Sequence, residues 1–146
     1  MNTKSAYNKI MNYCTIKQID VMSSNTWYAL PEENVISHVW KGKPTKTWVY
    51  SMLHELGHIK LYNKKNYSRK NWKIIKERPF DKPNIVASAQ HMREEIEAWE
   101  EGLSIAKFIK LDIDREDYDK FSAPCIMTYM KVLSKPHQNK KINNDI

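Results

Sequence analysis

Apolar residues recur every three or four positions in residues 49–62. The stripe consists of Val49, Met52, Leu53 and Leu56. This spacing predicts a helix that buries one side. Thr45 and Thr47 are both suited to accept a hydrogen bond from the first turn of a helix, so we expect the helix to begin just after one of them.

A second stretch, from about Ile85 to Lys110, has the same periodicity and predicts a longer helix. One side of this helix carries Met92, Glu95, Ile96, Trp99, Gly102, Leu103, Ala106 and Ile109. Glu95 is the acidic residue on this apolar side, whereas the other glutamates nearby (Glu94, Glu97, Glu100 and Glu101) project in opposite or flanking directions. A buried carboxylate is costly unless it is paired or binds a metal. The pattern therefore predicts a specific partner for Glu95.

Shorter patterns predict the remaining elements. Residues 1–13 are expected to form a short first helix, and β-capable runs within residues 16–40 predict two or three strands, with a hairpin turn at residues 31–34. Residues 63–83 are polar and contain two prolines, so we expect mostly loop. A C-terminal helix is predicted over residues 114–133, capped by Asp114 and broken at Pro124.

Together these elements predict an α+β fold in which a small antiparallel sheet packs on the two long helices. The 146 residues, 41% of them hydrophobic, suit a single domain over 1–146, with a polar tail from about residue 135. The chain lacks an apolar run of the length that a membrane helix needs, and residues 1–14 lack the apolar core of a signal peptide. We therefore expect a soluble, cytoplasmic protein without a membrane partner. Cys14 and Cys125 are expected to be free thiols.

The formal net charge of +7 makes nucleic acid a possible partner. A basic cluster contains Lys60, Lys64, Lys65, Arg69, Lys70, Lys73 and Lys76, with Tyr67 and Trp72 among them. No recognised nucleic-acid motif accompanies this cluster, so we interpret it as a solvated loop.

The predicted helix over residues 49–62 contains His54-Glu55-Leu56-Gly57-His58, the spacing H-E-x-x-H. Side chains four residues apart lie on the same side of a helix, so His54 and His58 can bind one ion together. Zn²⁺ accepts histidine nitrogens at about 2.0–2.1 Å, and catalytic zinc sites combine three protein ligands with a water. Glu55 is then placed to act as the general base that takes a proton from this water. Gly57 is unfavourable in an exposed helix, so its presence predicts that another backbone or a substrate approaches closely there.

Two segments, HELGHIKLY at residues 54–62 and EIEAWEEGLSIA at residues 95–106, resemble those of the gluzincin class of zinc metallopeptidases. The chain is most similar to the small cytoplasmic ImmA/IrrE-type peptidases, which phages and mobile elements often encode. The resemblance implies a minimal gluzincin-like fold, in the host cytoplasm if the protein is phage-encoded. It implies an endopeptidase that hydrolyses peptide or protein substrates with Zn²⁺ held by His54, His58 and Glu95. It also implies that Glu55 is the catalytic base.

The chain departs from the pattern of this family at two places. Trp99 occupies the position, four residues after the ligand glutamate, where the family usually has Asn or Asp, and this puts the usual support of the ligands in doubt. Glu101-Gly102 replaces a phenylalanine-alanine pair. Glu94 and Glu97 therefore remain alternative ligands.

Other residues near the motifs have more than one interpretation. His91 precedes Glu95 by one helical turn and can be a ligand, a group that polarises the substrate carbonyl, or a histidine bonded to backbone. Tyr50 and Tyr62 can donate a hydrogen bond to an oxyanion or serve only in packing. We expect the strand within residues 35–40 to offer its edge to an extended substrate.

Two alternative functions remain at this point. The first is a nucleic-acid-associated metalloprotease of the SprT type, in which His91 would be the third ligand. The second is a non-catalytic binding protein whose basic surface is its working part. Salt-dependent DNA binding that is insensitive to a chelator would favour the second alternative.

Overall fold

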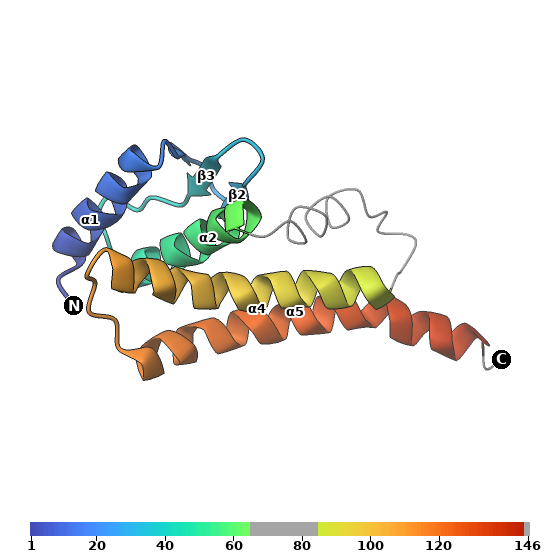
Figure 1. The fold of residues 1–146 in the computed structure, drawn as a ribbon. Coiled ribbons are helices and arrows are strands. Elements are labelled where there is room, and N and C mark those ends of the chain that lie inside the picture. The colour runs from blue at the N-terminus through green and yellow to red at the C-terminus, as the bar shows by residue number, and fades with distance from the viewer. Residues whose placement is uncertain (65–84, 145–146) are drawn as a thin grey trace.

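The computed structural model describes residues 1–64 and 85–144, with side chains up to Ser134. These residues form an α+β fold with four helices and one three-stranded sheet (Figure 1). The elements are α1 (Thr3–Ile16), β1 (Asp20–Ser23), β2 (Tyr28–Leu30), β3 (Val35–His38), α2 (Lys46–Lys64), α4 (Ile85–Phe108) and α5 (Arg115–Asn144). Most of the segment predicted to be loop, residues 65–83, lies outside the described residues. No described helix combines the length and apolar character needed to cross a membrane.

The sheet is mixed, so the prediction of a purely antiparallel sheet is wrong. β2 and β3 form the expected antiparallel hairpin, with Ala29 opposite Ile36. β1 is parallel to β3, with Val21 opposite Ile36. The chain reverses once between β1 and β2 and again in the hairpin, so β1 and β3 run in the same direction and β3 lies between the other two strands.

The central position of β3 overturns a further expectation. Both edges of β3 are paired, one with β1 and the other with β2. Its backbone N–H and C=O groups therefore cannot bind an extended substrate strand, as the sequence analysis expected for residues 35–40.

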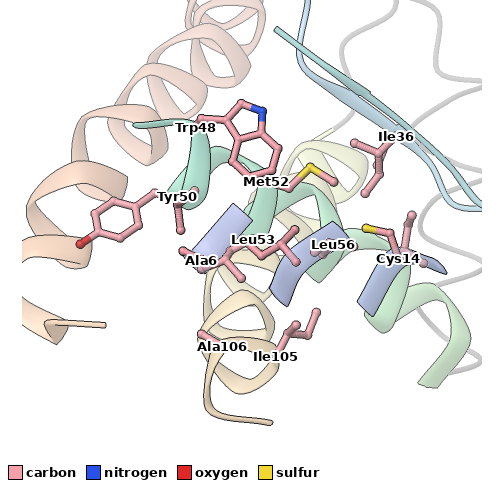
Figure 2. Packing of buried hydrophobic residues seen from close by; sticks show 14 of the residues in the cluster. Ala6, Cys14, Ile36, Trp48, Tyr50, Met52, Leu53, Leu56, Ile105 and Ala106 are labelled. Atoms are coloured by element: carbon pink, nitrogen blue, oxygen red, sulfur yellow. The ribbon is translucent and has the colours of Figure 1, made fainter. Parts of the chain in front are cut away.

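Helix α2 is the central element of the core. Thr45 caps it, because the Thr45 hydroxyl accepts a hydrogen bond from the backbone N–H of Trp48 at 3.1 Å. The predicted stripe is buried, with Val49, Met52 and Leu53 fully shielded from solvent. Figure 2 shows side chains from α1, β3 and α4 around those of α2. The helix is therefore covered on more than one side, which holds it rigidly in place.

Helices α2 and α4 approach each other closely at two glycines. A Cβ atom built on Gly57 would lie 1.9 Å from the backbone oxygen of Ala98, and one on Gly102 would lie 2.6 Å from that of Leu53. This confirms the expectation that another backbone comes close to Gly57. It also explains why glycine follows Glu101 in this chain. The close approach lets side chains from the two helices meet.

Helix α5 begins as predicted but does not break at Pro124. The Asp114 carboxylate caps it by accepting a hydrogen bond from the N–H of Asp117 at 2.8 Å. The helix then continues from Arg115 through Asn144. Pro124 is exposed, so water can bond the carbonyl that loses its partner on this side of the helix. Tyr118 is buried between α5 and α4 and donates a hydrogen bond to the backbone oxygen of Trp99 at 2.8 Å.

Candidate metal centre

Two helices bring together the residues that the sequence analysis predicted as metal ligands. α2 carries His54 and His58, and α4 carries Glu95. The Nε2 atoms of the two histidines are 3.2 Å apart. One carboxylate oxygen of Glu95 lies 3.0 Å from Nε2 of His54, and the other lies 3.4 Å from Nε2 of His58. All three side chains are buried.

These three distances fit a tetrahedral metal ion. Zinc–ligand bonds of 2.0–2.1 Å, at tetrahedral angles, place neighbouring ligand atoms about 3.3 Å apart. The two histidine nitrogens are 3.2 Å apart, close to that value, and each lies within 3.4 Å of a different oxygen of Glu95. One ligand atom from each of the three residues lies within 4.8 Å of the others. The donor set of two imidazole nitrogens and one carboxylate oxygen also suits zinc. The geometry can therefore hold a divalent ion and leave its fourth position open.

Without an ion, the three groups perturb one another strongly. Burial alone would raise the pKa of Glu95, but the charge of His58 and hydrogen bonds from both histidines outweigh it and hold the pKa below its usual range. Burial would lower the pKa of His58, yet the neighbouring carboxylates, Glu95 foremost, raise it. Burial lowers the pKa of His54, opposed in part by Glu95. A positive charge is thus favoured next to Glu95, where a metal cation would sit.

Glu55 follows His54 on α2 but is not a member of the ligand cluster. Its carboxylate is buried, and the combined effect of burial, an opposing charge on His58 and the carboxylate of Glu95 raises its pKa to about 7. A carboxyl group that exchanges a proton near neutral pH is suited to general acid–base chemistry. The structure thus places an acid–base group beside the ligands.

Glu94 is a buried neighbour of His58, although the sequence pattern predicted that it lies away from the buried side of its helix. Helical projection put Glu94 away from the apolar side of the helix, yet it is only 2% exposed. α4 contacts both α2 and α5, so its buried surface is wider than a single apolar stripe. One Glu94 oxygen lies 3.8 Å from Nδ1 of His58, the ring nitrogen that points away from Glu95. This carboxylate can orient the imidazole from behind, as metal-binding histidines usually require.

Replacing Glu94 with glutamine is expected to weaken zinc affinity about 10- to 100-fold, because His58 loses the charged group that orients its ring. Competition with a chromophoric chelator measures this affinity. Glu100→Gln is the matched control, since Glu100 lies on the same helix and pairs with Arg115 at 2.6 Å on the surface. Equal zinc affinity in Glu94→Gln and wild-type protein would contradict the role of Glu94.

Trp99 provides a different kind of support for His54. The two rings are stacked, with their centroids 4.1 Å apart and their planes 21° from parallel. Nδ1 of His54 is buried without a hydrogen-bond partner in the part of the chain that the structure describes. Stacking on Trp99 therefore holds the His54 ring where the family usually has a hydrogen-bonding Asn or Asp.

Other predicted candidates lie at the edge of the site or outside it. His91 places Nε2 3.8 Å from a Glu95 oxygen and does not belong to the ligand cluster, nor does Glu97. The Tyr50 hydroxyl donates a hydrogen bond to Asp117 at 2.7 Å and lies in the core. Tyr62 lines a separate cavity of about 490 Å³ together with residues of α1. Neither of these two tyrosines belongs to the ligand cluster of the described residues.

The basic cluster gives no further support to a nucleic-acid site. Lys60 and Lys64 both pair with Glu101, each at 3.0 Å. The remaining members of the cluster lie outside the described residues.

No family model, curated protein or solved structure matches this chain. The similarity to gluzincins therefore rests on the two sequence segments, and the metal centre rests on the geometry of its own side chains. What the structure establishes is an α+β fold with a buried His54, His58 and Glu95 cluster that can hold a metal ion.

Proposed function

We propose that this protein is a zinc-dependent endopeptidase with a minimal gluzincin-like fold. The observation that carries the proposal is the buried cluster of His54, His58 and Glu95. The two histidine Nε2 atoms are 3.2 Å apart, and each lies 3.0–3.4 Å from an oxygen of the Glu95 carboxylate. Three protein ligands leave one position open, as catalytic zinc sites do, whereas structural sites are closed by a fourth. The open position and the adjacent carboxylate of Glu55 favour catalysis over a purely structural metal.

The proposed reaction is hydrolysis of a peptide bond. A zinc ion bound at this site would supply Lewis acidity that polarises the substrate carbonyl and lowers the pKa of a water molecule. As the oxygen of this water attacks the carbonyl carbon, Glu55 accepts a proton from the water. The same carboxyl group then delivers the proton to the nitrogen that leaves. Burial of Glu55 keeps the proton near the reacting atoms rather than in bulk solvent.

The surrounding side chains position the ligands. Glu94 lies behind His58, and Trp99 stacks on His54. The close contact between Gly57 and Ala98 fixes the distance between the two helices. Because misplacement by about 1 Å can cost 10²-fold in rate, this rigid frame is suited to catalysis.

The third ligand separates this proposal from the SprT-type alternative. Glu95 has an oxygen near each histidine, whereas His91 lies outside the ligand cluster, with its Nε2 3.8 Å from Glu95. This arrangement favours Glu95 as the third ligand. The alternative would require His91 to replace it.

Metal analysis of purified variants tests the proposal. We expect wild-type protein to bind one zinc per chain, Glu95→Ala to lose at least about 100-fold in zinc affinity because one of three ligands is missing, and His91→Ala to bind zinc as the wild type does. Loss of zinc in His91→Ala, with retention in Glu95→Ala, would support the SprT-type site instead. Wild-type protein that binds no zinc but binds DNA in a salt-dependent manner would point to the non-catalytic alternative.

A further inference from the structure

Helix α5 carries a tyrosine, Tyr129, that belongs to neither sequence motif but lies close to the candidate metal centre. Figure 1 shows α5 running alongside α4, and the two helices are in contact. Tyr129 of α5 lies against His91 of α4, with ring centroids 5.4 Å apart. His91 in turn places Nε2 3.8 Å from an oxygen of Glu95. Tyr129 is therefore separated from a proposed metal ligand by a single side chain.

Burial and the carboxylates of the candidate site affect the pKa of Tyr129. Burial raises the pKa of its phenol, and the carboxylates of Glu95 and Glu55 raise it further. Cys125, one turn earlier on α5, likewise has a pKa raised by burial and then by Glu95. Cys125 and Tyr129 lie one turn apart on α5, the helix that packs against α4. Tyr129 is also 38% exposed, so its ring lies at the boundary between the site and solvent.

This position suits a hydrogen-bond donor for a substrate. A phenol with a raised pKa stays neutral and keeps its O–H proton, so it can donate. A donor at the rim can meet a peptide that enters from solvent, whereas the hydroxyl of Tyr50 is already bound to Asp117. Tyr62 belongs to a different cavity. Tyr129 therefore combines access to solvent with a link, through the ring of His91, to the ligand Glu95.

We propose that Tyr129 donates a hydrogen bond to the carbonyl oxygen of the scissile peptide bond as that oxygen gains negative charge. The proposal rests on the proposed peptidase function. Donors aimed at a developing oxyanion commonly contribute about 10²–10³ in kcat. The proton stays on Tyr129, which stabilises the charge without accepting or releasing a proton.

The test compares Tyr129→Phe with Tyr28→Phe, which removes a hydroxyl on β2 that donates to the sulfur of Met22 at 3.7 Å. The substrate is a fluorogenic peptide selected with the wild-type protein from a mixed-sequence library. We expect Tyr129→Phe to lower kcat about 100-fold, with KM changed less than about threefold, because the hydrogen bond strengthens in the transition state. Tyr28→Phe should match the wild type.

Two further measurements separate this role from a structural one. The affinity for a phosphinic peptide, whose tetrahedral phosphinate imitates the oxyanion, should fall about 10- to 100-fold in Tyr129→Phe. Zinc affinity and the urea unfolding midpoint should stay at wild-type values. Unchanged kcat and phosphinate affinity would overturn the assignment of Tyr129, and so would a loss of zinc affinity of the same size as the loss of activity.

The failure of this inference is distinguishable from failure of the proposed function. Wild-type protein that binds zinc and cleaves the peptide, with Tyr129→Phe equally active, would reject only the role of Tyr129. Wild-type protein that binds no zinc and cleaves no peptide in the library would reject the peptidase function and the role of Tyr129 with it.

Discussion

Replacing Glu55 with glutamine is expected to reduce peptide hydrolysis about 10³-fold or more while leaving zinc bound. Glutamine has nearly the shape of glutamate, so it fills the same buried position beside His54. Its amide cannot accept the proton of the attacking water. Because Glu55 is not a member of the ligand cluster, the metal content should stay at one zinc per chain. Parallel measurement of zinc content and of kcat/KM on one peptide checks both the retention of zinc and the loss of hydrolysis.

The control for this experiment is Glu100→Gln, which removes a carboxylate from the surface pair with Arg115. It should retain wild-type activity. Full activity in Glu55→Gln would reject Glu55 as the base. Joint loss of zinc and activity would instead show that Glu55 takes part in holding the metal.

Replacing Gly57 with alanine is expected to destabilise the protein by about 3 kcal/mol or more, in the upper part of the range for overpacked cores. Elsewhere in a helix the same change commonly stabilises by up to about 1 kcal/mol, because alanine is the better helix former. At Gly57 the change in stability has the opposite sign, because the new Cβ would lie 1.9 Å from the backbone oxygen of Ala98. Backbone cannot move aside as a flexible side chain can, so α2 and α4 must separate. Urea unfolding of the metal-free protein measures the change.

The separation of α2 and α4 should also displace the ligands of the candidate metal centre. His58 follows Gly57 directly, and its partner Glu95 lies one turn before Ala98. Zinc affinity should therefore fall together with stability. Ala89→Gly is the control, because Ala89 is an exposed position on α4 and should lose only about 1 kcal/mol. Wild-type stability and zinc affinity in Gly57→Ala would contradict the close packing of the two helices.

Several features of this protein followed from the sequence alone. The buried stripe of α2, its cap at Thr45 and the cap of α5 at Asp114 are confirmed. The convergence of His54, His58 and Glu95 also followed, because two local rules define it. Residues four apart share one side of a helix, and a carboxylate on an apolar side needs a partner. Such rules depend on neighbours along the chain, which a single sequence displays directly.

Other features were decided only by the tertiary structure, since they depend on segments far apart in the sequence. β3 lies between its neighbours because it pairs with β1 along one edge and with β2 along the other. The burial of Glu94 came from the packing of α4 against both α2 and α5, which a single helical projection cannot include. The same holds for the stacking of Trp99 on His54 and for the approach of Tyr129 to His91. The sequence thus determined which side chains can bind a metal, and packing between distant segments decided which groups surround them.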